Sequence, residues 1–488
     1  AQVARSPRVV TSSGAMRAKR CWVAAVLVAA CRAEATEPHC CWAGAGTTLF
    51  EGPEATGKSQ ADWRRGLLEW RERTIRESGI TGAEPRPPWA LSTYVQPQVH
   101  LWDRYLYNET SHEFTVGVFL QDLRDRYGGV DSVLLWATYP NLGIDARNQW
   151  DMWRALPGGL EAVKNLTSQF HEAGVRVLWG YNPFDQGLRE EGEPHWTTLA
   201  RLLKETGGDG FNGDTMYLVY KEFIDAGEAI GHPIVGEAEG GGYPSPYGRE
   251  RDSTWAPADW NFLGWGYYHA GNSDGITNKF WREPGVDRAK WLDSRGRRQT
   301  HVCDRWAKDR HDAMQYAHFN GVGYESWENV WGVYMTFTKR DGEALRRLQT
   351  VWRWLGTSRF TSDYDEWLPY TPEIRREGLY ASRWRHSNGT CAWTVVNRDP
   401  EARRFDLETN TSACEGGRLV DLFAGREVQG GGLELEGLGY GAYLLTSEAP
   451  SGLRALLETM RGMTEPLSAF DACWSPLRQR MQPQGSPP

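Results

Sequence analysis

The sequence predicts an α/β fold, a (β/α)8 TIM barrel followed by a small antiparallel β-sandwich. Between about residues 96 and 356, short apolar runs that end in polar or glycine residues alternate with helical stretches. Behind them, from about residue 378, helical periodicity stops and short segments alternate apolar and polar residues between Gly, Asn and Asp turns. The residues after the first run read WDRYLYNET, without the glycine-rich phosphate fingerprint of an open doubly wound sheet, so we favour the closed barrel.

The predicted barrel has eight strands joined by helices that end at glycines. Apolar residues at near-helical spacing precede Gly174, Gly207 and Gly356, and glycine suits a helix C-terminus. The sixth strand has the weakest pattern. The strand runs begin at Val99, Ser132, Val175, Gly208, His232, Asn261, Thr300 and Gly321.

The amino terminus has the pattern of a secretory signal. The basic stretch MRAKR precedes the apolar run WVAAVLVAAC and then Ala33-Glu34-Ala35, a small-x-small cleavage pattern. The run of roughly 10 residues is shorter than the roughly 20 that a membrane span requires. We therefore expect a secreted or lumenal protein without a membrane span. The predicted divisions are an N-terminal extension and signal peptide (1–35), a segment leading into the barrel (36–95), the barrel (96–360), the β-sandwich (378–447) and a tail or linker (448–488).

Cysteines and glycosylation sequons agree with an exported chain. Cys391 and Cys414 lie 23 positions apart on segments able to form neighbouring strands, so we expect a disulfide between them. Asn108, Asn165, Asn388 and Asn410 begin N-x-Ser/Thr triplets, which favour exposed positions. No Cys or His cluster has zinc spacing, so the sequence predicts neither a metal nor a cofactor.

Charge and aromatic content indicate the class of ligand. The net charge of −8, without long basic runs, argues against a nucleic-acid partner. The chain has 25 Trp, whose flat faces suit the apolar faces of sugar rings, although core packing explains most of them. Active sites of (β/α)8 barrels gather where the strands end. Carboxylates follow most of the predicted strands, and we therefore expect a carbohydrate substrate.

Glycosidic cleavage needs two carboxyl groups in different protonation states. We predict Asp214, which ends FNGD, as the nucleophile, because Gly213 lets the backbone approach the ligand and the start of the next helix stabilises negative charge. Glu237 ends the apolar run PIVGE, which should keep its carboxyl protonated as the acid, in preference to Glu239 on the same strand face. We expect the two carboxyl groups to lie about 5 to 5.5 Å apart, as in retaining enzymes. In the competing reading, Asp214 only caps the next helix.

Other residues at the strand ends are candidates for binding substrate. Glu325 and Glu328 suit sugar hydroxyls, whereas Asn212 and His301 are equally well explained as polar groups of the core. Glu325 and Trp327 are expected at the same mouth as Asp214. The predicted substrate-binding residues are Asp103, Trp136, Tyr181, Asn182, Asp185, Asn212, Glu239, Trp265, His301, Glu325, Trp327 and Glu328.

An Asp at strand four, a Glu after Gly at strand five, an Asp at strand seven and a β-sandwich behind the barrel together resemble the α-amylase family of retaining glycosidases. The resemblance covers roughly residues 96–446 and implies that Asp214, Glu237 and Asp304 are nucleophile, acid/base and transition-state stabiliser. The chain departs from the family pattern at Asn212, where the family has Arg, and at Cys303, where it has His. For Asp304, an ion pair with Arg305 or Arg310 is an equally good explanation.

Two further resemblances lead to different expectations. α-Galactosidase-like barrels also carry an Asp nucleophile at strand four, with an Asp acid at strand six, a role open to Asp259. The barrel is also similar to the front half of proteins that continue into a formylglycine-generating, sulfatase-modifying domain. A carbohydrate-binding barrel without turnover, or the ligand-presenting part of a longer protein, therefore remain alternatives to a glycosidase.

Overall fold

The computed structural model describes residues 49–472, except 79–86, 138–145, 184, 186–188, 215, 217–218, 239–260, 270–282, 293–298, 300, 305–309, 330–336, 375, 410–412, 415 and 431. For residues 261–269 and 303–304 it describes the backbone alone. The predicted signal peptide and the last part of the predicted tail lie outside these residues and stay predictions.

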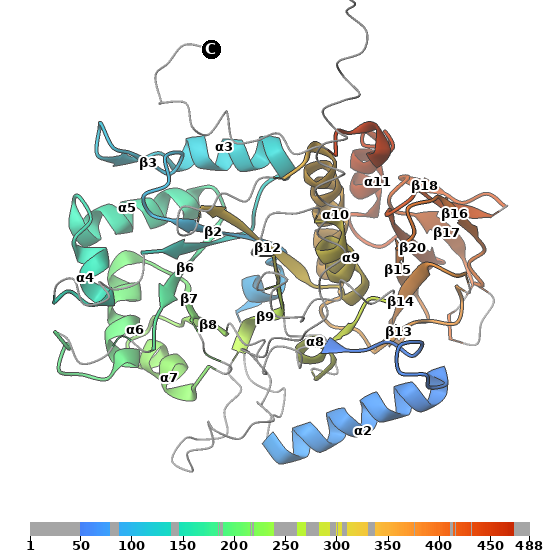
Figure 1. The fold of residues 1–488 in the computed structure, drawn as a ribbon, viewed down its shortest axis with the longest axis horizontal. Coiled ribbons are helices and arrows are strands. Elements are labelled where there is room, and N and C mark those ends of the chain that lie inside the picture. The colour runs from blue at the N-terminus through green and yellow to red at the C-terminus, as the bar shows by residue number, and fades with distance from the viewer. Residues whose placement is uncertain are drawn as a thin grey trace, which may run out of the picture. The chain divides into compact units, whose positions relative to one another are not determined.

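Eight parallel strands close into a barrel, as the sequence predicts (Figure 1). Each predicted run contributes to one strand, although the first strand begins four residues earlier than expected, at Val95. Closure rules out the open doubly wound sheet. Around the barrel the strands are β2 (Val95–His100), β5 (Ser132–Trp136), β6 (Arg176–Tyr181), β7 (Gly210–Gly213), β8 (Val235–Ala238), β9 (Asn261–His269), β11 (His301–Asp304) and β12 (Gly323–Asn329).

Amphipathic helices join the strands and bury one face against them. Gly207, in the left-handed conformation with φ 79°, ends α6 as predicted, and Gly174 with φ 77° follows α5. Gly356 does not end its helix but lies inside α10. Glycine suits this position because a Cβ there would meet the Tyr94 hydroxyl at 1.8 Å. The helices of the barrel are α3 (Val116–Tyr127), α4 (Gln149–Arg154), α5 (Gly159–Glu172), α6 (His195–Thr206), α7 (Lys221–Ala229), α8 (Arg288–Leu292), α9 (His311–Asn320) and α10 (Lys339–Thr357).

Short elements precede the barrel and lie within its loops. Helix α2 (Gln60–Ser78) packs on α8, and β1 (Leu49–Phe50) pairs with β10 (Val286–Asp287). The small pair β3 (Tyr107–Asn108) and β4 (Glu113–Phe114) lies in the loop after β2, and a 3-10 turn (Pro88–Leu91) precedes that strand.

A six-stranded antiparallel sheet follows the barrel, as the alternating segments predict. One face packs on α9, which Figure 1 shows beside the sheet, and the other is covered by the two-stranded sheet of β16 (Arg403–Phe405) and β19 (Leu433–Leu435). The strand order is β13 (Glu366–Pro369), β14 (Leu379–Arg385), β15 (Cys391–Asn397), β20 (Tyr440–Thr446), β17 (Arg418–Asp421) and β18 (Arg426–Glu427).

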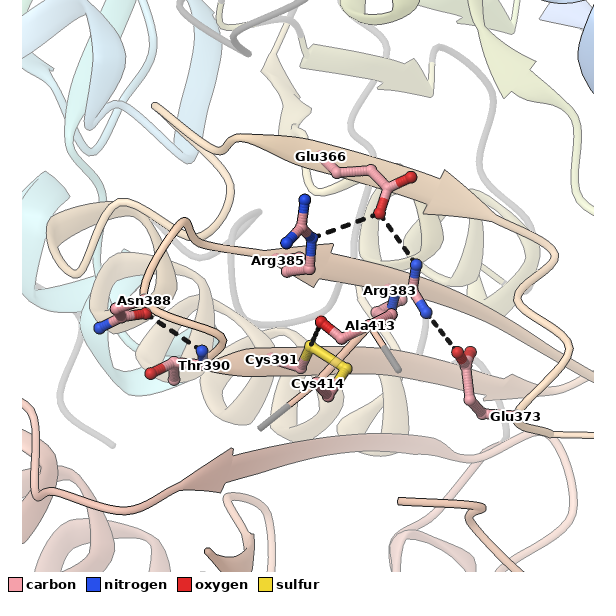
Figure 2. Close-up of a disulfide and its surroundings, with 9 residues drawn as sticks. All are labelled: Glu366, Glu373, Arg383, Arg385, Asn388, Thr390, Cys391, Ala413 and Cys414. Atoms are coloured by element: carbon pink, nitrogen blue, oxygen red, sulfur yellow. Dashed lines mark hydrogen bonds and ion pairs between the residues drawn. A yellow bond between two sulfur atoms is a disulfide. The ribbon is translucent and has the colours of Figure 1, made fainter. Parts of the chain in front are cut away.

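The predicted disulfide between Cys391 and Cys414 is present (Figure 2). It joins the first residue of β15 to the loop before β17, with a Cα separation of 5.7 Å. Arg383 on the neighbouring strand β14 pairs with Glu366 and Glu373. A bridge that closes a loop of this length typically stabilises a fold by about 3 kcal/mol.

The start of the predicted tail folds onto the barrel. Helix α11 (Leu453–Arg461) buries Leu453, Leu456 and Met460 against the main hydrophobic core, and Trp354 of α10 donates its indole N–H to the Ser451 carbonyl at 3.1 Å. A 3-10 turn (Leu467–Ala469) also packs on α10. None of the helices in the described part of the chain combines the length and hydrophobicity that a membrane span needs.

His318 joins helix α9 to the antiparallel sheet in a fully buried position. Its Nε2 lies 2.8 Å from the Gly441 carbonyl oxygen, and its Nδ1 accepts a hydrogen bond from the Trp352 indole at 3.0 Å. A carbonyl and an N–H donor fix the neutral tautomer with its proton on Nε2. Burial lowers the pKa of His318 from 6.5 to about 4.

We expect His318 to make the fold less stable in acid. The unfolded chain takes up a proton as the pH falls through 6.5, whereas the folded chain does so only near pH 4, so stability is lost between these values. The expected loss is about 3 kcal/mol in the free energy of unfolding, measured by urea denaturation from pH 7 to pH 4. In His318→Gln this loss of unfolding free energy between pH 7 and pH 4 should be absent. His112→Asn, which replaces an exposed histidine, should retain it. Parallel pH profiles for wild type and His318→Gln would contradict the assignment.

Candidate active site

Asp214 follows the fourth barrel strand and lies at the barrel mouth. It is 7% exposed, and its backbone N–H donates to the Tyr181 carbonyl at the end of the neighbouring strand β6 (2.8 Å). A carboxylate in this place, at the carboxyl end of a barrel strand, is where such folds carry their chemistry. The structure therefore keeps Asp214 as the leading catalytic candidate.

The surroundings of Asp214 differ from those that the sequence predicts. Helix α7 begins at Lys221 with Tyr220 as its N-cap, so Asp214 neither caps that helix nor lies at its N-terminus. Gly213 is required by close packing within the chain, because a Cβ there would meet the Met216 sulfur at 2.3 Å. Neither the helix-cap explanation nor helix-dipole stabilisation of the carboxylate applies.

Glu237 points into the barrel, one layer deeper than Asp214. It pairs in register with Asn212, two residues before Asp214, and is fully buried. Its Oε2 accepts a hydrogen bond from Gln96 Nε2 at 2.7 Å. Strands β2 and β8 lie opposite each other in the eight-strand order, so this bond crosses the barrel interior.

Glu237 belongs to an interior polar cluster with Gln96, His301 and Glu325, all fully buried. His301 Nδ1 lies 3.6 Å from Glu237 Oε1, and Gln96 Nε2 lies 3.4 Å from Glu325 Oε2. One ligand atom each from Glu237, His301 and Glu325 lies within 4.8 Å of the other two, a donor set able to hold a metal ion.

Glu325 and Trp327 face the barrel interior and not the outer helices, so the strand count holds. Glu325 pairs in register with Gln96 of the adjacent strand β2, whose inward-pointing amide lies 3.4 Å from its carboxylate, and Trp327, two residues on, shares its phase and is fully buried. Asn212 is also fully buried, and neither of its amide atoms has a hydrogen-bond partner among the described residues. Trp136 lies over Gly180 of β6, where a Cβ would meet its ring at 2.6 Å.

Glu328 was predicted to bind substrate, but it points away from the mouth. Its buried carboxylate pairs with Arg126 of α3 and accepts a hydrogen bond from the Tyr127 hydroxyl at 2.9 Å. Since residues 325 and 328 are three apart, they lie on opposite faces of the strand. Glu328 anchors α3 to the barrel wall.

Asp103 and Asp185 are held by loop contacts near the strand ends. Asp103 accepts from the Tyr105 backbone N–H at 2.9 Å and from the Asn329 amide at 3.1 Å. Asp185 accepts from the backbone N–H of Gln149, the first residue of α4, and burial raises the pKa of its carboxyl. These hydrogen bonds explain both carboxylates as groups that anchor their loops.

Asn182 lies where β6 ends and is buried. Its backbone N–H donates to Gln149 Oε1 at 2.9 Å, and its carbonyl accepts from Gln149 Nε2 at 2.8 Å. Its side-chain oxygen has no hydrogen-bond partner among the described residues. Asn182 thus anchors the end of β6 to α4 through its backbone, and its role toward substrate stays a prediction.

An aromatic pocket of about 550 Å³ lies between the barrel wall and helices α6 and α7, and Asp214 is not among its lining residues. Tyr181 lines the pocket, with its hydroxyl 3.0 Å from His195 Nδ1, and Met216 lines it as well. The pocket lies between the ends of β6 and β7 and the starts of α6 and α7. Its walls include His195, Trp196, Tyr220 and Phe223.

The structure does not describe the side chains of three predicted site residues. Glu239 lies outside the described residues, and for Trp265 and Asp304 the structure gives the backbone alone, in β9 and at the end of β11. Asp259, the alternative acid, also lies outside the described residues. Their roles stay predictions, as does the separation expected between the carboxyl groups of Asp214 and Glu237.

Sequence reasoning missed the polar residues at the start of the first strand. Gln96 and Gln98 alternate with Pro97, and a proline inside a run argues against a strand. Gln96 and Gln98 are two positions apart, the spacing of residues on one face of a strand, and this spacing was the signal that could have revealed them. The pocket residues His195, Trp196 and Tyr220 carried no such signal, because the first two begin α6 and the third lies in the loop before α7.

Comparisons with known proteins return glycoside hydrolases at low identity. No family model and no curated protein matches the chain. Similar solved structures include an α-amylase from Geobacillus thermoleovorans (12% identity, TM-score 0.49, covering 75% of this chain and 100% of that one). An α-galactosidase I from Mortierella vinacea (10%, 0.45, 74% and 98%) and a GH31 family sulfoquinovosidase from E. rectale (14%, 0.43, 82% and 67%) are also similar. The chain thus distantly resembles glycoside hydrolases, whereas activity has to be argued from its own residues.

Proposed function

We propose that this protein is a secreted glycoside hydrolase that cleaves a carbohydrate by a retaining, two-carboxylate mechanism with Asp214 as nucleophile. The observation that carries the proposal is the position of Asp214, directly after β7 at the mouth end of the barrel, where its side chain is 7% exposed. A carboxylate at the carboxyl end of a barrel strand lies where such folds carry their chemistry and suits attack on the anomeric carbon of a sugar.

The acid/base is proposed among the carboxylates at the end of β8. Gly213 pairs with Ala238, so the residues that continue these two strands in sequence are Asp214 and Glu239. Glu237 lies one layer deeper and is held by Gln96. We therefore propose Glu239, the rival of Glu237 in the sequence-based assignment, as the acid/base, with Asp304 as transition-state stabiliser.

Carbohydrate binding without turnover is the second candidate function. It is favoured by the contacts of Glu237, the carboxylate first expected to be the acid, with Gln96 and His301 in the barrel interior. In this case Asp214 and the pocket would hold a sugar that is not cleaved.

Covalent labelling distinguishes the two functions. A panel of mechanism-based glycosidase inactivators should give one adduct per chain, and peptide mapping should place it on Asp214. Asp214→Asn should remain unlabelled under the same conditions. Sugar binding in the absence of any adduct or released sugar, across the panel, would favour the binding barrel.

A further inference from the structure

We propose that Glu237, His301 and Glu325 form a binding site for one divalent transition-metal cation inside the barrel. The argument for this site does not rest on the proposed hydrolase activity. It comprises residues on three strands, β8, β11 and β12, whose ligand atoms lie within 4.8 Å of one another.

The imidazole of His301 presents a lone pair to the site. Its Nε2 lies 3.1 Å from the Thr93 carbonyl oxygen. A carbonyl only accepts hydrogen bonds, so Nε2 carries the proton and Nδ1 of the neutral ring is an acceptor. Metal-bound histidines commonly donate their other ring N–H to a backbone carbonyl in this way.

Glu237 Oε1 faces that lone pair. The two atoms are 3.6 Å apart, both are buried, and neither has a hydrogen-bond partner among the described residues. Two acceptors at this separation do not form a hydrogen bond with each other. The separation equals one edge of a tetrahedron with metal–ligand distances of about 2.2 Å, within the range of zinc–carboxylate bonds.

Outer hydrogen bonds orient the two carboxylates. Ser132 donates to Gln96 Oε1 at 2.6 Å, which turns Gln96 Nε2 toward Oε2 of Glu237 (2.7 Å) and Oε2 of Glu325 (3.4 Å). Hydrogen-bonded outer oxygens are typical of carboxylates that ligate metals. Both carboxylates are fully buried, and a dication would offset the high cost of burying their charge.

Asn212 supplies an independent indication. It is the in-register neighbour of Glu237, points to the same face of the barrel wall and is fully buried. Its amide oxygen and nitrogen have no hydrogen-bond partner in the described part of the chain. A metal with one remaining coordination position would give this oxygen a partner.

The test measures metal binding by the full-length chain without substrate. After treatment with a chelator, wild type should bind one equivalent of Zn²⁺ by calorimetry, and its melting temperature should rise. His301→Ala and the isosteric Glu237→Gln should each lower the affinity at least tenfold, and Gln96→Leu should lower it by about 10- to 100-fold. His232→Ala removes another ring that contacts a backbone carbonyl, at Gly208, and should leave binding unchanged.

Spectroscopy keeps the proposal testable if a variant fails to fold. X-ray absorption at the zinc edge of the wild-type protein should show nitrogen and oxygen ligands and no sulfur. A sulfur ligand, no binding of Zn²⁺, or equal affinity in folded His301→Ala would overturn the proposal. Since none of these measurements involves turnover, their outcome is separate from that of the hydrolase assignment.

Discussion

Replacing Asp214 by Asn should lower kcat at least about 10³-fold while sugar binding stays measurable, because the amide keeps the shape of the side chain but cannot attack the anomeric carbon. The measurement is turnover of aryl glycosides together with calorimetric binding of the released sugar. Asp225→Asn is the matched control, since Asp225 lies on α7 and pairs with Lys221 at the surface.

Rescue by a small anion separates a nucleophile from a binding group. In Asp214→Gly the space left by the carboxylate should admit azide, which would form a glycosyl azide and restore part of the rate. A rate within a few-fold of wild type for Asp214→Asn would remove Asp214 from the mechanism.

The barrel could be predicted because its signals are local. Strands such as β5 and β6 are short apolar runs, and Gly207 ends α6 where its left-handed conformation is needed. The disulfide was also predictable, because Cys391 and Cys414 lie 23 positions apart in the β-sandwich of a chain predicted to be exported, although Cys414 lies in the loop before β17 and not on a strand. Local patterns of this kind survive in the fold because tertiary contacts do not oppose them.

The depth of a side chain inside the barrel could not be predicted from sequence. Strand phase indicates that Glu237 points inward, but its level depends on the register between strands and on the Gln96 side chain, which reaches across the barrel. Glu328 illustrates the same limit. Its partner, Arg126, is 202 positions away, and no local pattern links the two residues.

Register also decides which carboxylate should be the acid, and this leads to the last prediction. Glu239→Gln should slow substrates with basic leaving groups by about 10² to 10⁴-fold, because the departing oxygen then receives no proton. Aryl glycosides with acidic leaving groups should be nearly unaffected. Glu237→Gln should instead change both substrate classes by a similar factor, because that carboxylate faces Gln96 and His301 in the interior cluster.

The measurement is a plot of log(kcat/KM) against leaving-group pKa for wild type and both variants. A slope that steepens only in Glu239→Gln supports the proposed acid. A slope that steepens only in Glu237→Gln would return the acid role to Glu237 and require its carboxyl to leave Gln96 during the reaction. In that event, substrate binding would have to reach one layer deeper than Asp214, since Glu237 is level with Asn212 in the barrel wall.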